Sequence, residues 1–456
     1  MYGYHQFVTD INAVENGIWM RDLHAKFQAP LTGIWVFRQP VLVVADPEVT
    51  RRILLSDSDL FRNRYLASGK SDPVGGLNIF TIKDPTWSNI RRRITYIFTA
   101  AKLKAMHGLL SSKSKATVNR IQQDKANNKT TEIRTLFTDY TTDIIGTSLF
   151  GMQNDAVGTG DSALRAVTRE FMRFDWFRGL SIYSIFFWPA LVDIFRFSFF
   201  PKKSVDFFRK TVNTIIEHRT TNNLENNDLL DALVKMKKEK LDDGDDLLAA
   251  QATIMLQGGF DTSAVALTFM VNELAHNSKI QEKLYKELSE AKKKKDGADF
   301  NFSDLEKLVY LNCVIKESLR RYPPMGWLDR ISSVDYKIND SFTLPANIPV
   351  YINAIGMHHD PKLFPEPYKF DPDRFLPENE QNFVPFSYLP FGDGPRMCLG
   401  KRFALMSMWY LLSELILSME LQPLPCSTMP SKVIFESKAP FLMPEHPISV
   451  EFIPRN

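Results

Sequence analysis

The sequence predicts a mainly α-helical protein with a minor β-sheet region. Between residue 87 and about residue 320, apolar side chains recur at three- and four-residue spacing, which is the pattern of amphipathic helices. Short β-rich stretches occur near the beginning of the chain and again among the prolines of residues 325–395. No period of 20–50 residues repeats, and no long linker interrupts the chain. We therefore expect one domain, residues 1–456.

Local signals predict the individual elements. β-Rich runs on both sides of Arg38-Gln39-Pro40 predict a hairpin, and Asp46-Pro47 supplies an N-cap and a first-turn proline for a short helix. Ser303-Asp304-Leu305-Glu306 matches a capping box, and the helix that it opens must end before Pro323-Pro324. In chain order, the predicted elements are strands Thr32–Phe37 and Val41–Val44, a short helix from Asp46 to Leu54, a long apolar helix from Leu247 to His276, a helix from Ser303 to Tyr322, an extended piece from Val350 to Ile355, and a last helix from Lys401 to Met419.

The composition excludes several classes of protein. Hydrophobic residues make up 44% and charged residues 24% of the chain, which is ordinary for a globular protein. Lys and Arg total 56 against 53 Asp and Glu, a balance too even for a protein that mainly binds phosphate backbones, so we expect no nucleic-acid partner. The 3 cysteines cannot form a disulfide framework. A buried, inert thiol is the common fate of such residues, and we expect it for Cys313 and Cys426.

One cysteine lies in a setting that suits a thiolate. The segment 391–400 reads Phe-Gly-Asp-Gly-Pro-Arg-Met-Cys-Leu-Gly and stands directly before the last predicted helix, whose N-terminus favours a sulfur anion at Cys398. Gly394 and Gly400 remove side chains where a bulky planar group could approach the backbone. Arg396 could pair with a carboxylate on that group.

This segment resembles the haem-binding loop of the cytochrome P-450 monooxygenases, whose pattern is F-x-x-G-x-R-x-C-x-G. The resemblance implies the P-450 fold, with haem b held between two central helices. It makes the Cys398 thiolate the axial ligand of the haem iron, and it assigns Phe391 and Arg396 to haem binding. In this family the haem performs the oxidation, while the protein supplies the thiolate, the pocket and a path for protons.

Glu317 and Arg320 stand three residues apart on one predicted helix face, where they can form an ion pair. An exposed pair of this kind contributes only about 0.3–0.5 kcal/mol, but the apolar neighbours Val314 and Leu319 favour partial burial. The pair resembles the E-x-x-R motif of the same family, and Arg374 matches the arginine that completes its buried network. The resemblance implies that these three residues hold the cysteine loop in place.

Two glycines, Gly258 and Gly259, stand in the middle of the long apolar helix, each at a cost of about 1 kcal/mol relative to alanine. Close approach of a flat ligand and tight helix packing are both sufficient reasons, and the spacing does not decide between them. The segment 258–263 resembles the oxygen-activation motif of the family, A/G-G-x-D/E-T-T/S. The resemblance makes Asp261 and Thr262 the catalytic pair that relays protons, a task that needs groups within hydrogen-bond reach.

Trp87 and Arg91 are four residues apart on a predicted helix and face the same side. They could be a core tryptophan beside an arginine that reaches solvent, but they resemble the family's W-x-x-x-R pair, which binds a haem propionate. Arg330 matches another propionate-binding arginine. The family's layout also implies a pocket for lipophilic ligands, since its positions are mostly apolar or aromatic here. The expected pocket residues are Phe80, Phe260, Met325, Trp327, Leu328 and Phe441.

The four motifs follow the family's order and together imply a monooxygenase that inserts one atom of O₂ into a lipophilic small molecule and reduces the other to water. No dinucleotide-binding fingerprint is visible in the chain, so the electrons must come from outside. Similarity to microsomal members implies NADPH-cytochrome P-450 reductase as the donor, with cytochrome b5 as a candidate second partner. A haem-thiolate isomerase or dehydratase and a non-catalytic haem sensor stay open as alternatives. The expected reductase-docking face consists of Arg92, Lys102, Lys104, Lys401 and Arg402.

Membrane signals in the sequence are mixed. The longest uncharged apolar stretch, Gly179–Val192, has 14 residues and is too short to span a bilayer, and the N-terminus shows no signal-peptide pattern. The segment 182–200 could rest on a membrane, cover the pocket entrance or be plain core. The region 207–230 resembles insect microsomal members associated with xenobiotic metabolism, which implies the cytosolic face of the endoplasmic reticulum membrane. Those members begin with a membrane anchor that is missing ahead of Met1, so we expect a truncated form, an incomplete gene prediction or a soluble departure.

Overall fold

The computed structural model describes residues 18–455 apart from 227, 239–244, 426 and 440. The helices are α1 (Ile18–Phe27), α2 (Pro47–Arg51), α3 (Pro73–Leu77), α4 (Thr86–Thr95), α5 (Ala100–Ala105), α6 (His107–Ala126), α7 (Ile133–Phe150), α8 (Ala156–Thr159), α9 (Ala163–Phe171), α10 (Trp176–Phe187), α11 (Ala190–Phe195), α12 (Lys202–Asn222), α13 (Leu229–Lys238), α14 (Asp245–His276), α15 (Ser278–Lys293), α16 (Phe302–Glu306), α17 (Val309–Arg321), α18 (Ala354–His358) and α19 (Lys401–Ser418). The strands are β1 (Leu31–Val36), β2 (Gln39–Val44), β3 (Leu328–Ile331), β4 (Tyr336–Asn339), β5 (Phe342–Leu344), β6 (Pro349–Ile352), β7 (Met419–Pro423) and β8 (Val450–Pro454).

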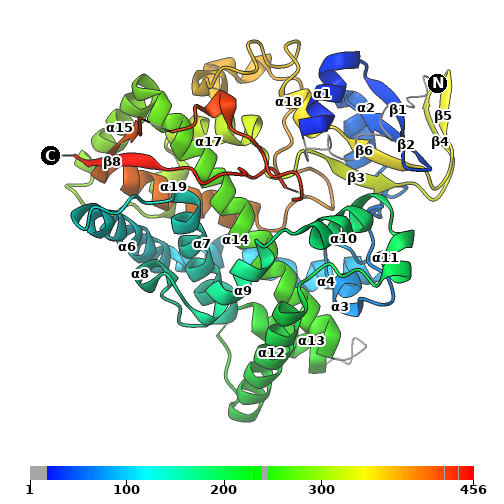
Figure 1. Ribbon diagram of the computed structural model, residues 1–456, viewed down its shortest axis with the longest axis horizontal. Helices are drawn as coiled ribbons and strands as arrows, with labels where there is room; N and C mark the ends of the chain where they lie inside the picture. The colour runs from blue at the N-terminus through cyan, green and yellow to red at the C-terminus, as the bar shows by residue number, and fades with distance from the viewer. Residues whose placement is uncertain (1–17, 227, 239–244, 426, 440, 456) are drawn as a thin grey trace.

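The long helix α14 runs through the middle of the molecule, as the sequence predicts (Figure 1). It packs most extensively against α7, and it also contacts α12, α17 and α19. Among the described residues, 246–276 form a helix long and apolar enough to cross a membrane, but 72% of its most apolar window is buried inside the protein. Burial by neighbouring helices accounts for its apolar character. Helix α19 is the second central helix, and Cys398 lies directly ahead of it.

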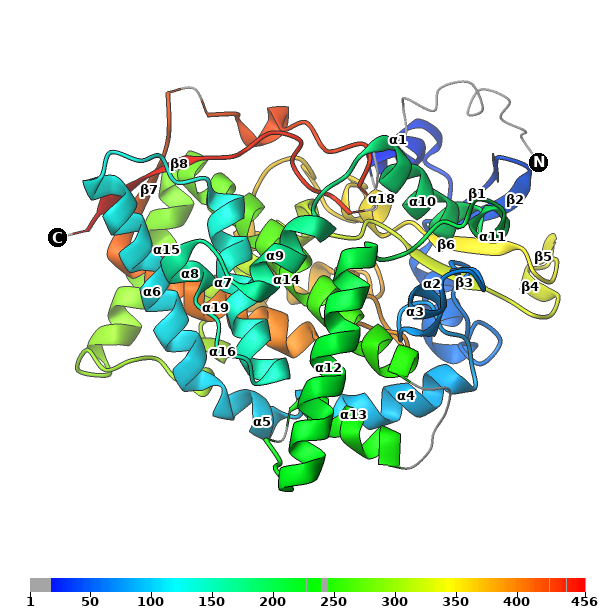
Figure 2. The ribbon, with the colours of Figure 1, turned by 60° about the horizontal axis from the view of Figure 1, so that its bottom comes forward.

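The β-structure lies at opposite ends of the molecule (Figures 1 and 2). At one end, the order β1-β2-β6-β3 forms a mixed sheet in which β2 and β6 run parallel, and at the other end β7 pairs antiparallel with β8. The predicted hairpin is confirmed, but its turn is shorter than expected. Because Val36 pairs with Gln39, the turn consists of residues 37–38, and Pro40 belongs to β2.

The helix predicted from Ser303 to Tyr322 is wrong at its beginning. Asn301 is the N-cap of α16, and its side chain forms the capping box with Asp304 instead of the Ser303–Glu306 pair expected from the sequence. α16 then ends at Glu306, and α17 starts separately at Val309. The cause is local: an asparagine two positions earlier satisfies the first free backbone N–H groups before Ser303 can.

Candidate active site

The Cys398 loop joins the extended segment before Phe391 to helix α19. The backbone N–H of Cys398 donates to the carbonyl of Phe391 at 2.9 Å and closes the loop. Gly394 has a φ of +71°, and a Cβ there would lie 1.8 Å from the carbonyl oxygen of Leu54. The close approach that demands this glycine is therefore made by Leu54, which corrects the reason expected from the sequence. At Gly400, the described chain has no atom within 4 Å of the Cβ position, as a planar ligand would need.

The Cys398 side chain is accessible at the head of helix α19. It has exposed surface, although it lies deep among protein atoms ahead of the first turn of α19. Burial raises the pKa of the Cys398 thiol, whereas the N–H of Gly400 and the charges of Arg91 and Arg64 lower it. These groups stabilise a sulfur anion once a metal cation offsets the cost of desolvation.

Helix α4 brings Trp87 and Arg91 to this loop. The Arg396 guanidinium lies 3.9 Å from the centroid of the Trp87 ring, which is a cation–π contact. Arg91 donates to the carbonyl of Met397 at 3.0 Å. Trp87 therefore contacts Arg396, and Arg91 contacts Met397, its neighbour in the cysteine loop.

Five basic side chains gather beside the loop and outnumber the carboxylates that act on them. This cation cluster consists of Arg64, Lys83, Arg91, Arg330 and Arg396. Burial lowers the pKa of both Arg330 and Arg396, and the charge of Arg64 adds to both effects. Among the described residues, Asp329 and Asp84 are the carboxylates that oppose this. Because arginine does not lose its proton in proteins, the cluster keeps its excess of positive charge.

Unpartnered donors in the cation cluster indicate an anionic ligand. Within the described part of the chain, Nε of Arg64 and Nη1 of Arg396 are buried without a hydrogen-bond partner. Free guanidinium donors and a nearby thiol suit a ligand that carries both carboxylates and a metal ion. The residues therefore fit haem b, with Cys398 for the iron and the arginines of the cluster for the propionates. Sequence patterns alone do not identify Arg64 or Lys83, because neither stands in a recognisable motif.

Glu317 and Arg320 of α17 form a fully buried ion pair. Nε and Nη2 of Arg320 donate to the two carboxylate oxygens of Glu317 at 2.7 and 2.8 Å. Nε of Arg374 lies 3.2 Å from Oε2 of Glu317, so the three predicted residues meet. Arg320 also donates to the carbonyl of His358 at 2.6 Å. The network ties α17 to two distant segments of the chain, those of His358 and Arg374.

Asp261 and Thr262 are neighbours on α14, but their side chains have different partners. The Asp261 carboxylate lies 3.3 Å from Nη2 of Arg134, at the beginning of α7. The Thr262 hydroxyl donates to the carbonyl of Gly258 at 2.7 Å. Arg134 is a third member of this site, and sequence patterns miss it because it is 127 positions away from Asp261.

The two glycines of α14 have different surroundings. A Cβ on Gly259 would lie 2.7 Å from Cδ1 of Ile145, so this glycine lets α14 pack tightly on α7. At Gly258, no atom of the described chain outside its own helix turn lies within 4 Å of the Cβ position. Helix packing therefore explains Gly259, and access for a ligand remains the explanation that suits Gly258.

The expected pocket residues divide into two groups. Phe260 and Trp327 are almost fully buried, and their rings pack on other aromatic rings, those of Phe171 and Phe187 respectively. The others are half-buried and therefore retain surface that a ligand can contact. These are Phe80, Met325, Leu328 and Phe441. Leu442 donates its backbone N–H to the carbonyl of Pro324 at 2.9 Å, which places the late segment beside the residues that follow α17.

Buried His358 predicts a pH dependence of stability. Its Nε2 accepts from the backbone N–H of Leu389 at 2.9 Å, so the proton is on Nδ1, which donates to the carbonyl of Arg320. Burial lowers the pKa of His358 from 6.5 to about 3. In the unfolded chain, His358 therefore binds a proton near its ordinary pKa of 6.5, whereas in the folded chain it stays neutral at that pH. The contribution of His358 to the free energy of unfolding therefore has its full value above the unfolded pKa, and this free energy declines as the pH falls toward the folded pKa.

Urea unfolding between about pH 7.5 and 5.5 measures this effect. We expect the free energy of unfolding to fall by up to about 1.4 kcal/mol per pH unit for each such histidine. His358→Gln should reduce the slope by about that amount, because it removes the titrating group. Equal slopes for the two proteins would show that His358 does not carry the dependence.

Comparisons with known proteins agree with this site. The family model described as Cytochrome P450 matches residues 6–452. Cytochrome P450 3A9 of Rattus norvegicus is 32% identical, with 99% of this chain and 90% of the rat protein aligned. Probable cytochrome P450 6g2 of Drosophila melanogaster is 34% identical, with 82% of this chain and 76% of the fly protein aligned. Cytochrome P450 6k1 of Blattella germanica is 29% identical, with 95% of this chain and 86% of the cockroach protein aligned. With its cysteine loop, buried Glu–Arg network and central acid–threonine pair, the chain belongs to the cytochrome P450 family of haem-thiolate monooxygenases, whose cofactor is haem b.

Proposed function

We propose that this monooxygenase inserts one oxygen atom from O₂ into a lipophilic small molecule, with electrons from NADPH delivered by a flavoprotein reductase. The observation that carries the proposal is the acid–hydroxyl pair on α14, present together with Cys398. An isomerase, a dehydratase or a haem sensor has no need of a proton relay, so the pair favours oxygen activation. The half-buried apolar side chains of Phe80, Met325 and Phe441 support a lipophilic substrate. We also propose that residues 1–456 act as one domain.

The protein's own groups have distinct tasks in this reaction. Cys398 would bind the iron and the arginines of the cation cluster would bind the propionates, and the bound haem would supply the oxidising chemistry. Arg134 fixes the Asp261 carboxylate on the side of α7. The Thr262 hydroxyl can exchange its donation to Gly258 for donation to a bound ligand, since a hydroxyl hydrogen rotates. Asp261 and Thr262 can thus pass protons inward.

Replacing Thr262 tests the relay. Reconstituted with reductase and NADPH, the parent should convert a lipophilic substrate to a product that carries one atom from labelled O₂. Thr262→Ala should release hydrogen peroxide in place of product, and the product formed per NADPH should fall by about tenfold because one proton-transfer group is lost. Thr262→Ser keeps the hydroxyl and should retain most of the coupling. Unchanged coupling in the alanine variant would remove Thr262 from the relay.

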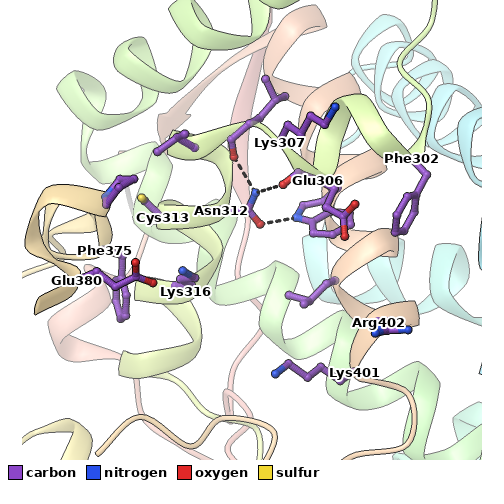
Figure 3. A pocket seen from close by; sticks show the side chains of 15 residues that line it. Phe302, Glu306, Lys307, Asn312, Cys313, Lys316, Phe375, Glu380, Lys401 and Arg402 are labelled. Atoms are coloured by element: carbon purple, nitrogen blue, oxygen red, sulfur yellow. Dashed lines mark hydrogen bonds between the residues drawn. The ribbon is translucent and has the colours of Figure 1, made fainter. Parts of the chain in front are cut away.

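A groove beside the cysteine loop supports reductase docking (Figure 3). It has a volume of about 460 Å³ and lies between α16, α17 and the beginning of α19. Its apolar floor is bordered by more basic than acidic side chains. The basic ones are Lys307, Lys316, Lys401 and Arg402, and the acidic ones are Glu306 and Glu380. Nζ of Lys104 lies 5.8 Å from the centroid of the Phe302 ring, so it extends this basic border to α5. The charge excess suits an acidic partner surface.

Charge reversal at Lys401 and Arg402 tests this docking face. Both side chains are exposed, so the double change to glutamate should leave the fold intact. The reductase concentration for half-maximal turnover should rise by roughly tenfold, and its dependence on salt should weaken. A matched control reverses Lys279 and Lys286, two exposed lysines of α15, and should change neither quantity. Equal behaviour of both double variants would rule out this face.

Exposed apolar side chains support attachment to the endoplasmic reticulum membrane. They cluster on neighbouring helices α10 and α11 (Figure 1). The exposed residues there are Trp176, Phe177, Leu180, Ile194 and Phe195, at 53–70%. The ring centroid of Phe37, in the β1–β2 turn, lies 5.0 Å from that of Trp188, which directly follows α10. Most of the other apolar residues of 182–200 are buried, so that segment is core apart from Ile194 and Phe195. We propose that the patch meets the cytosolic leaflet, and that the substrates include xenobiotics.

A further inference from the structure

The segment 62–66 is held from two sides beside the cation cluster. The backbone N–H of Ile331 in β3 donates to the carbonyl of Asn63 at 3.0 Å. The N–H of Leu66 donates to the buried carboxylate of Asp329 at 2.9 Å. On the other side, Nε of Arg396 donates to the carbonyl at position 62 at 2.9 Å. These contacts fix the path of the chain on each side of Arg64.

Lys83 adds a third anchor, and it does so without an ion pair. Its ammonium donates to the carbonyl of Arg64, to that of Leu66 at 2.7 Å and to that of Tyr65 at 3.5 Å. Within the described residues, no carboxylate oxygen lies within 4 Å of its Nζ. Burial lowers the pKa of Lys83 to about 8; the charge of Asp329 opposes this effect, and the charges of Arg396 and Arg64 add to it. A cation placed among cations is costly unless it performs a specific task.

The Arg64 side chain shows what that task is. Its guanidinium lies 4.0 Å from the centroid of the Phe80 ring. The charge of the same guanidinium lowers the pKa of the Cys398 thiol. Its Nε has no hydrogen-bond partner in the described part of the chain. No salt bridge holds this guanidinium among the described residues, so its position depends on the Phe80 ring and on the backbone that Lys83 grips.

We propose that Lys83 is a positioning residue for haem binding: by gripping the carbonyls of residues 64–66, it aims the Arg64 guanidinium at a haem carboxylate. The inference rests on the assignment of haem b to this site. The Lys83 ammonium donates to backbone carbonyls, and on this proposal it acts entirely through Arg64. A lysine that merely stabilised the loop would act whether or not Arg64 were present.

Haem release from the purified holoenzyme to excess apomyoglobin tests the proposal. Lys83→Met keeps the length of the side chain and removes its donors, and we expect release to become about tenfold faster. Arg64→Met should have a similar effect. The double variant should release haem no faster than Arg64→Met alone, because residues that act through one another are not additive. Lys125→Met is the matched control, since Lys125 also donates to a backbone carbonyl, that of Phe452, at 2.8 Å.

Resonance Raman spectra of the same holoenzymes give a second readout. Lys83→Met should move the propionate bending bands in the same direction as Arg64→Met, whereas Lys83→Arg should restore them at least in part. Unchanged release in Lys83→Met, or effects that add in the double variant, would overturn the proposal. If Lys83→Met yields no holoenzyme, Lys83→Gln replaces it with the same expectations. A parent that binds no haem would instead overturn the cofactor assignment.

Discussion

Cys398→Ser should abolish monooxygenation. The Cys398 thiolate would bind the haem iron and supply electron density to it, and a serine hydroxyl does not ionise near neutral pH to replace it. The loop itself should survive, because its closing hydrogen bond runs from the backbone N–H of residue 398 to the carbonyl of Phe391. We therefore expect a folded variant with less haem and a turnover at least about a thousandfold below the parent. The measurement is haem content per chain together with product formation under reductase and NADPH.

Cys313 provides the control for this substitution. It is a buried thiol on α17, and burial raises its pKa to about 11, so it stays protonated. Cys313→Ala should keep haem content and turnover close to those of the parent. The account fails if Cys398→Ser retains the parent's turnover, or if Cys313→Ala loses it to the same extent.

Glu317→Gln should prevent the holoenzyme from accumulating. The Glu317 side chain is 0% exposed, and it neutralises both Arg320 and Arg374. Removing its charge leaves two buried or nearly buried guanidinium groups facing a neutral amide. Breaking a buried ion pair in this way costs about 3–5 kcal/mol, a large part of the stability of a typical domain. The yield of haem-containing protein and the urea midpoint report the effect.

The exposed pair Glu48–Arg51 is a control with the same spacing. Its side chains are 64% and 38% exposed, and Arg51 Nη2 lies 2.7 Å from Glu48 Oε1. Because water and salt screen such a pair, Glu48→Gln should leave both the yield and the urea midpoint unchanged. If the two glutamine variants behaved alike, the buried network could not be what holds the cysteine loop.

The sequence predicts most of the helices and the centre of the site, because both depend on local patterns. The apolar stretches of α14 and α19 are long, and the positions of both helices are confirmed. The Cys398 loop and the Glu317–Arg320 pair each lie within ten residues, so their chemistry can be recognised before any fold is known. The hairpin turn and the cap of α16 differ by one or two residues, since competing capping and turn residues stand close together there.

Residues that reach the site from distant parts of the chain could not be predicted in this way. Arg134 meets Asp261 across the α7–α14 interface, and Lys83 grips carbonyls 17–19 positions earlier. Neither contact follows from periodicity or from a motif, because each depends on how two elements pack. The same holds for Gly394, whose lack of a side chain is explained by the backbone of Leu54.

The most direct test of the central claim is the absorption spectrum of the reduced carbon-monoxide complex of the purified parent protein. Its Soret band reports which atom of the protein is bound to the haem iron. The account predicts the strongly red-shifted band typical of a sulfur anion, supplied by Cys398, and its loss in Cys398→Ser. A band at the position typical of imidazole-ligated haem, or a purified protein without haem, would contradict it.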